Sequence, residues 1–119
     1  MSDIDVRHFA LVNRTCKDPD KIVATFGSDH AHLVHMAMGI SGEAGELLDA
    51  IKKHVIYNKR LDVENIIEEL GDLEWFLQGL RAVLNITREQ TLEHNITKLL
   101  KRYPDAYTDE AAQARADKK

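Results

Sequence analysis

The segment GISGEAGELLDAIKK, residues 39–53, decides the fold, because it reads as a helix and yet contains three glycines. These glycines recur at intervals of three residues: Gly39, Gly42 and Gly45. Each interior glycine disfavours a helix by about 1 kcal/mol relative to alanine, so together they remove a sizeable fraction of a small domain's stability. We therefore expect other groups to approach the backbone of this helix closely.

The composition indicates a single all-α domain. The 119 residues, 44% of them hydrophobic, suit one buried core. Prolines and glycines are few, and abundant Leu, Ala, Glu and Lys favour helices. We predict an antiparallel helical bundle of four to five helices. Two long apolar stripes need covering on both sides, so we expect oligomerisation, as a homodimer or homotetramer, to complete the bundle.

The charge and the cysteine content exclude several classes of protein. A formal net charge of -4 argues against a protein that grips a nucleic-acid polymer along a basic surface. The single Cys16 cannot form an internal disulfide, and the sequence shows neither a signal-peptide pattern nor an apolar run long enough to span a membrane. We therefore expect a cytoplasmic protein without a membrane partner.

Hydrophobic periodicity predicts where the helices lie. The expected helices cover residues 4–14, 29–57, 62–84 and 87–104, with one further helical turn at residues 21–25. Asp62 is a suitable N-cap, and Thr87 forms a capping-box pattern with Gln90. The connection between the two longest helices is short, which favours an antiparallel pair.

The longest helices each carry one apolar stripe, and the chain divides into three parts. The first stripe consists of Leu33, Ile40, Ala44, Leu47, Ile51 and Val55, and the second of Val63, Ile66, Leu70, Leu73, Leu77 and Leu80. We assign residues 1–27 to an N-terminal helix and connection, residues 28–104 to the core, and residues 105–119 to a polar tail. The tail is expected to be loosely ordered or to pack on a partner chain.

Two pairs of acidic residues lie on the two longest helices. Glu43 and Glu46 are three residues apart, as are Glu69 and Asp72. This spacing places the two side chains of a pair about 60° apart on a helix, close enough to share one ion. A glycine, Gly45 or Gly71, lies inside each pair, and 22 residues separate the pairs. An antiparallel pair of helices therefore brings all four carboxylates together.

These carboxylates favour a magnesium site over simple surface charge. Glu43 projects about 40° from Leu47, and Glu69 about 40° from Leu73, so both pairs edge the apolar stripes. Four converging carboxylates repel one another unless a cation compensates them. Oxygen ligands suit Mg²⁺, or Mn²⁺ as a substitute, whereas zinc prefers nitrogen or sulfur. Either pair alone is more often a solvated helix surface, but two glycine-flanked pairs favour a metal site.

Three segments carry a family resemblance: GEAGELLDAIKK, EELGDLEWFL and NITKLLKRYP. Together they resemble the MazG-like all-α nucleoside triphosphate pyrophosphohydrolases over roughly residues 32–104, with one copy of the module where some relatives carry two. The family signature E-x-x-E, spacer, E-x-x-D falls on Glu43, Glu46, Glu69 and Asp72. The resemblance implies Mg²⁺-dependent cleavage of a (deoxy)nucleoside triphosphate to a monophosphate and pyrophosphate, in nucleotide-pool housekeeping.

The resemblance also implies roles for individual residues. The four carboxylates are expected to hold metal; Glu46 and Glu43 are the catalytic candidates, and Glu46 is our choice for the group that accepts a proton from water. Lys98 and Arg102 match the lysine and arginine that bind phosphate in the family. Two further candidates for substrate binding come from helical projection: Asn95, on the same edge as Lys98 and Arg102, and Lys53, about 20° from Glu46.

Other interpretations remain open at this point. One is a phosphoribosyl-ATP pyrophosphohydrolase, which shares this kind of helical metal site; another is a non-catalytic helical module that binds nucleotide or metal. Phe76 is expected in the core and Trp75 in a subunit contact, rather than stacked on a base. Three histidines cluster near the start of the long helix: His30, His32 and His35. Without a cysteine partner they do not favour zinc, and lining a nucleoside pocket is an open alternative.

Overall fold

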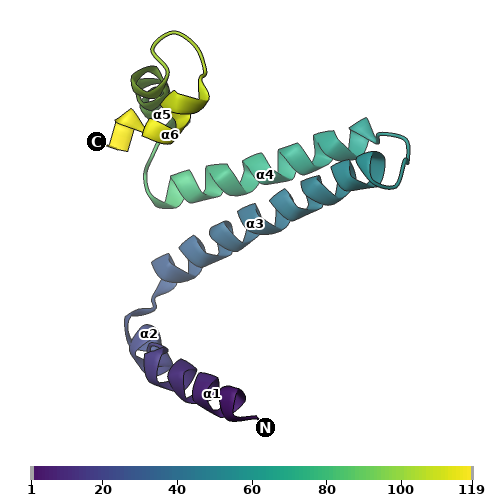
Figure 1. Ribbon diagram of the computed structural model, residues 1–119. Coiled ribbons are helices and arrows are strands. Elements are labelled where there is room, and N and C mark those ends of the chain that lie inside the picture. The colour runs from purple at the N-terminus through teal and green to yellow at the C-terminus, as the bar shows by residue number, and fades with distance from the viewer. Residues whose placement is uncertain (1, 119) are drawn as a thin grey trace. The chain divides into compact units, whose positions relative to one another are not determined.

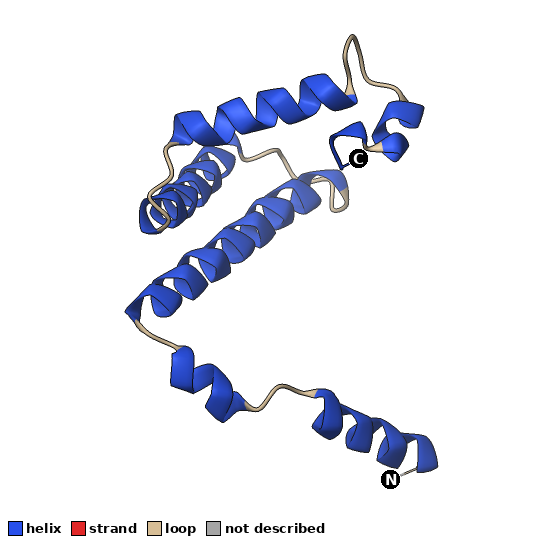
Figure 2. Cartoon of the chain, turned by 90° about the vertical axis from the view of Figure 1, so that its left-hand side faces the viewer, coloured by secondary structure: helices blue, strands red, loops and turns tan. Residues whose placement is uncertain are grey.

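A computed structural model describes residues 2–118, and in that range the chain is helical without strands. Figures 1 and 2 show the helices along the chain. Their bounds are α1 (Asp3–Thr15), α2 (Pro19–Thr25), α3 (Ser28–Val55), α4 (Val63–Val83), α5 (Arg88–Arg102) and α6 (Asp109–Ala114), followed by the short 3₁₀ helix η1 (Ala116–Lys118). The predicted all-α class is therefore confirmed, and the predicted helix bounds hold to within about two residues.

The helices begin where capping chemistry predicts. Asp62 accepts a hydrogen bond from the Asn65 backbone N–H at 3.1 Å. Thr87 and Gln90 complete a capping box, in which each side chain accepts from the other residue's backbone N–H, at 3.0 and 2.7 Å. Each such cap contributes about 1 kcal/mol to helix stability, since it satisfies N–H groups that the first turn leaves unpaired.

The chain divides into two compact units, Met1–Ala31 and His32–Lys119. The boundary between these two units falls inside α3. In the first unit, α1 begins with a capping box between Ser2 and Asp5, and α2 begins at Pro19 behind the N-cap Asp18. The described residues of this unit are all exposed, large apolar side chains included: Ile4, Val6, Phe9, Leu11, Val12, Ile22, Val23 and Phe26.

The second unit is organised around α3 and α4, which pair with antiparallel register. The Phe76 ring lies against the backbone of Gly39, and the Met36 side chain lies against the backbone of Gly79. Moving back along α3 from Gly39 to Met36 thus moves forward along α4 from Phe76 to Gly79. At either glycine a Cβ would overlap the facing side chain. Small residues therefore let the two helices pack closely here.

The expectation of close approach to all three glycines of residues 39–53 is correct only in part. Gly39 is covered by Phe76, but Gly42 and Gly45 face open space, as does Gly71. Gly79, which the sequence analysis did not single out, has the second close contact. Phe76 belongs to the packed face, as predicted, and Trp75 next to it is 63% exposed.

The packed faces of α3 and α4 are rotated relative to the predicted stripes. The two buried apolar residues of the described chain are Met36 and Ala50, neither of which was assigned to a stripe. Seven of the predicted stripe residues are half-buried: Leu33, Ile40, Leu47, Ile66, Leu73, Leu77 and Leu80. The other five are exposed: Ala44, Ile51, Val55, Val63 and Leu70. The rotation follows from packing Phe76 and Met36 against glycines, which carries Glu43 and Glu69 toward the helix interface rather than its edge.

The C-terminal tail differs from expectation, because much of it is helical and packs on the chain's own α5. Thr108 caps α6, and both α6 and η1 contact α5. Arg102 at the end of α5 forms an ion pair with Asp117 of η1. The tail was predicted to be loosely ordered because its composition is polar; the aspartate that anchors it is recognisable only once its arginine partner is known. Within residues 2–118, none of the helices has the length and apolar character needed to cross a bilayer.

Candidate metal centre

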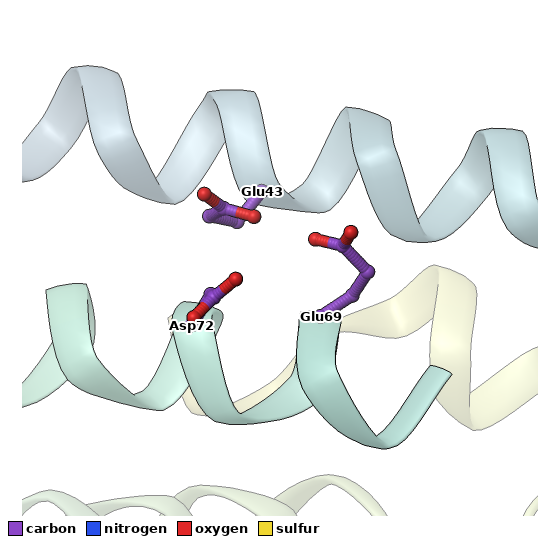
Figure 3. A group of neighbouring side chains, drawn as sticks. All are labelled: Glu43, Glu69 and Asp72. Atoms are coloured by element: carbon purple, nitrogen blue, oxygen red, sulfur yellow. The ribbon is translucent and has the colours of Figure 1, made fainter. Parts of the chain in front are cut away.

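Three carboxylates from α3 and α4 form a compact group. Glu43, Glu69 and Asp72 each offer an oxygen, and these oxygens all lie within 4.8 Å of one another. Figure 3 shows the three carboxylates facing one another, with Glu43 contributed by α3 and the other two by α4. The helix register produces the group, because Glu43 lies one turn after Gly39 and Asp72 one turn before Phe76.

Glu69 has the most constrained environment of the three. Its Oε2 atom is buried and has no hydrogen-bond partner among residues 2–118. The pKa of Glu69 is raised from 4.5 to about 7, first because a proton is shared with the Glu43 carboxylate, and then because of partial burial. Repulsion from Glu43, Glu46 and Asp72 raises it further. Near neutral pH this carboxyl group is therefore partly protonated, as expected where like charges converge.

Glu46 lies outside the compact group. Its side chain is exposed, and it is not one of the three residues whose oxygens converge. Its negative charge nevertheless contributes to the raised pKa of Glu69, which places it in the same electrostatic environment. The structure therefore brings together three of the four predicted metal ligands and leaves the fourth facing solvent beside them.

The group fits a hard divalent cation. Its donors are all carboxylate oxygens, which Mg²⁺ and Mn²⁺ prefer, and it contains neither histidine nor cysteine. A cation bound here would supply the missing partner of Glu69 Oε2 and would offset the repulsion that raises the pKa of Glu69. Of the histidines near the start of α3, His30 stacks on Phe26, and His35 lies edge-on to the Phe76 ring.

The glycines inside the acidic pairs face open space. A Cβ placed at Gly42, Gly45 or Gly71 would meet nothing within 4 Å. Gly42 immediately precedes the first acidic pair, and Gly45 and Gly71 lie inside the first and second pairs. The backbone beside the carboxylates is thus open to solvent at these glycines.

The cationic candidates have different surroundings. Lys53 pairs with Asp49 one turn earlier, at 3.1 Å, with both side chains largely exposed. Asn95 is exposed and Lys98 is half-buried on α5. Arg102 is engaged by Asp117: Arg102 Nε–H donates a hydrogen bond to Asp117 Oδ1, and Arg102 Nη2 forms an ion pair with the same oxygen. Sequence reasoning missed Asp117; an acidic residue in a tail of mixed charge gives no signal of its own.

Comparisons with known proteins agree with this geometry. A family model described as the MazG nucleotide pyrophosphohydrolase domain matches residues 32–107. The "Gene 37 protein" of Mycobacterium phage L5 is 32% identical over 76 residues, which cover 59% of this chain and 65% of the phage protein. The match thus spans slightly less than two thirds of that relative, and no solved structure matches the chain. The chain belongs to the family of MazG nucleotide pyrophosphohydrolase domains.

Proposed function

We propose that this protein is a Mg²⁺-dependent nucleoside triphosphate pyrophosphohydrolase, which cleaves a (deoxy)nucleoside triphosphate between the α and β phosphates. The products are a nucleoside monophosphate and pyrophosphate. The observation that carries the proposal is the convergence of Glu43, Glu69 and Asp72, with one buried oxygen lacking a partner, inside the matched domain. Removal of non-standard or surplus triphosphates is the cellular role we propose for this activity.

The carboxylates have separate tasks in this proposal. Glu43, Glu69 and Asp72 hold Mg²⁺, with Mn²⁺ as a possible substitute. Bound Mg²⁺ supplies charge neutralisation of the phosphates and an activated water nucleophile. Glu46, exposed beside the group, accepts the proton from the attacking water. An acceptor must stay ionised and reachable, and of the four carboxylates Glu46 combines solvent access with a position outside the compact group.

Cationic side chains of α3 and α5 bind the phosphate chain. Lys98 and Arg102 lie one turn apart on α5 and present their charges on the same face. Lys53 and Asn95 are additional ligands. Use of Lys53 requires breaking its ion pair with Asp49, which is exposed and therefore contributes little to stability.

We also propose a homodimer or homotetramer as the active assembly, in the cytoplasm, where triphosphates are available. Support comes from apolar side chains that stay exposed on the helices of the second unit, such as Met38 and Leu48 of α3, Ile67 and Trp75 of α4, and Leu100 of α5. Such surface is ordinarily covered in a folded protein. Light scattering coupled to size-exclusion chromatography measures the assembly directly.

The activity is tested by incubating the purified protein with each common and damaged nucleoside triphosphate, with and without Mg²⁺, and measuring released pyrophosphate. We expect Mg²⁺-dependent release that Glu46→Ala and Asp72→Ala abolish. Absence of pyrophosphate with every triphosphate contradicts the proposal, as does full activity in either variant. Phosphoribosyl-ATP belongs in the same screen, because selective turnover of that compound identifies a different pyrophosphohydrolase.

A further inference from the structure

Near the C-terminus, the side-chain carboxylate of Asp117 lies against Arg102, a candidate phosphate-binding residue. Arg115, after α6, adopts a left-handed backbone conformation with φ of 48°, and η1 follows it. Arg102 Nε and Nη2 both lie 2.9 Å from Asp117 Oδ1. The Asp117 side chain is only 5% exposed and that of Arg102 is 17% exposed. The contact is therefore a defined, shielded ion pair and not a loose surface pair.

Asp117 remains ionised in this pair. Burial acts to raise the pKa of Asp117, but the hydrogen bonds and the positive charge of Arg102 outweigh that effect, so its pKa lies below the usual value. The pKa of Arg102 is raised, chiefly by the bond to Asp117 and next by the Tyr103 hydroxyl. Both partners thus keep full charge at neutral pH.

The pair uses one edge of the guanidinium group. Arginine has five N–H donors; here Nε–H donates to Asp117 Oδ1, and Nη2 forms an ion pair with the same oxygen. The other N–H groups are on Nη1 and Nη2. That second edge has the fork geometry that grips two phosphate oxygens. An anion that bound this edge would leave the contact between Arg102 and Asp117 in place.

Held in this way, Arg102 has lost the rotational freedom of a long side chain. An arginine free in solvent must order several torsions when it binds phosphate, whereas one already fixed by a carboxylate does not. Lys98, half-buried one turn earlier on α5, lies on the same face of the helix. The segment that carries Asp117 is itself anchored, since α6 and η1 pack on α5.

We propose that Asp117 is a positioning residue, which fixes the Arg102 guanidinium so that its Nη1–Nη2 edge binds the phosphate chain of the substrate. This inference rests on the proposed function, because it takes Arg102 as a phosphate ligand. In the opposite role, Asp117 would block Arg102, and the substrate would have to displace Asp117. That displacement would break a shielded ion pair, although Arg102 has other N–H groups that do not contact Asp117. The structure favours positioning for that reason.

The sign of one substitution separates the two roles. Asp117→Asn removes a negative charge near the proposed phosphate site, so the electrostatic effect alone would tighten anion binding. If Asp117 instead blocked Arg102, the same substitution would free Arg102 and would also tighten binding. Loss of positioning weakens binding instead. We expect Asp117→Asn to raise the KM for the triphosphate and the Kd for inorganic tripolyphosphate with Mg²⁺ by about tenfold, with a smaller change in kcat. Asp117→Glu, which keeps the charge, recovers part of the affinity.

The experiment measures pyrophosphate release and calorimetric binding of Mg²⁺-tripolyphosphate for the full chain. Asp105→Asn is the matched control, because it makes the same charge change in the exposed part of the tail. In an Arg102→Ala background, Asp117→Asn is expected to have no further effect on KM or Kd. Circular dichroism and thermal unfolding show whether each variant remains folded.

Each outcome is decisive. An unchanged or lowered KM and Kd in folded Asp117→Asn overturns the inference, as does a weakening that persists in Arg102→Ala. If the wild-type protein binds tripolyphosphate but releases no pyrophosphate from any triphosphate, the proposed function fails and the Kd values still decide the role of Asp117. If it neither binds nor hydrolyses, both proposals fail.

Discussion

The Phe76 ring of α4 covers the backbone of Gly39 on α3, in the place that a side chain at position 39 would occupy. One turn further along α3, Gly42 faces open space. Two glycines of one helix, three residues apart, therefore have opposite roles: Gly39 permits helix packing, whereas Gly42 contributes nothing to it. The difference can be measured with a single methyl group at each position.

Gly39→Ala is expected to destabilise the protein and Gly42→Ala to stabilise it. The methyl group at position 39 overlaps Phe76, and forced overpacking costs about 1–3 kcal/mol, more than the gain in helix propensity. At position 42 the propensity gain of up to about 1 kcal/mol is unopposed. Chemical unfolding of both variants measures the free energies. Equal effects of the same sign would show that the α3–α4 packing described here does not form in solution.

Mg²⁺ is expected to stabilise the protein against heat through the three carboxylates. A cation that binds only the folded state raises stability by about 2.7 kcal/mol when its concentration is 100-fold above Kd. Thermal unfolding with Mg²⁺, Mn²⁺ and EDTA measures the shift, with Glu68→Gln as a control that changes an exposed neighbour on α4. Asp72→Asn should lose the shift. A shift that Asp72→Asn retains in full places the metal elsewhere.

The raised pKa of Glu69 predicts how stability depends on pH without metal. Its folded-state pKa is about 7 against 4.5 for an ordinary glutamate, so the folded state holds the proton more tightly. The resulting stabilisation is fully present below about pH 4.5 and is lost as pH rises through about 7. In EDTA at pH 8, Glu69→Gln should therefore be more stable than wild type, with no such gain at pH 4.

The comparison that checks this is the difference between wild-type and Glu69→Gln unfolding free energies across pH 4 to 8, because groups remote from Glu69 titrate equally in both. A difference that does not vary with pH contradicts the shared proton between Glu69 and Glu43. The same variant should lose the stabilisation by Mg²⁺, since its amide cannot replace the carboxylate charge.

Removing the charge of Glu46 or of Asp72 is expected to abolish activity for different reasons. Glu46→Gln should keep its affinity for Mn²⁺ but lose activity, with kcat lowered by about 100-fold or more, because proton transfer contributes 10²–10⁴-fold in general. Asp72→Asn should lose both metal affinity and activity. Calorimetric Mn²⁺ titration and pyrophosphate release separate the two. Equal loss of metal affinity in Glu46→Gln would make Glu46 a ligand instead.

Local signals predicted the helices well. Asp62 and the pair Thr87–Gln90 are caps that act within one turn of backbone, and each begins its helix as predicted. The antiparallel pairing of α3 and α4 follows from the short connection between them. Features of this kind depend on neighbours in the sequence, so the sequence alone contains the needed information.

Packing between helices was harder to predict. The stripes selected by hydrophobicity place Ile51 and Leu70 inside, but both are exposed, because the contact is set by where Phe76 and Met36 find glycines on the facing helix. Spacing correctly suggested that Glu43, Glu69 and Asp72 converge, yet it did not separate Glu46 from them. The Asp117–Arg102 pair joins residues 15 apart in the sequence and depends on a tail that composition described as unstructured.

The shared proton on Glu69 has a consequence beyond stability. Divalent ions and protons compete for the same oxygens. Binding of a divalent ion near neutral pH therefore releases, on average, a fraction of one proton per protein molecule. In a weakly buffered solution the arrival of magnesium would thus be recorded by an indicator dye as acidification, with no nucleotide present.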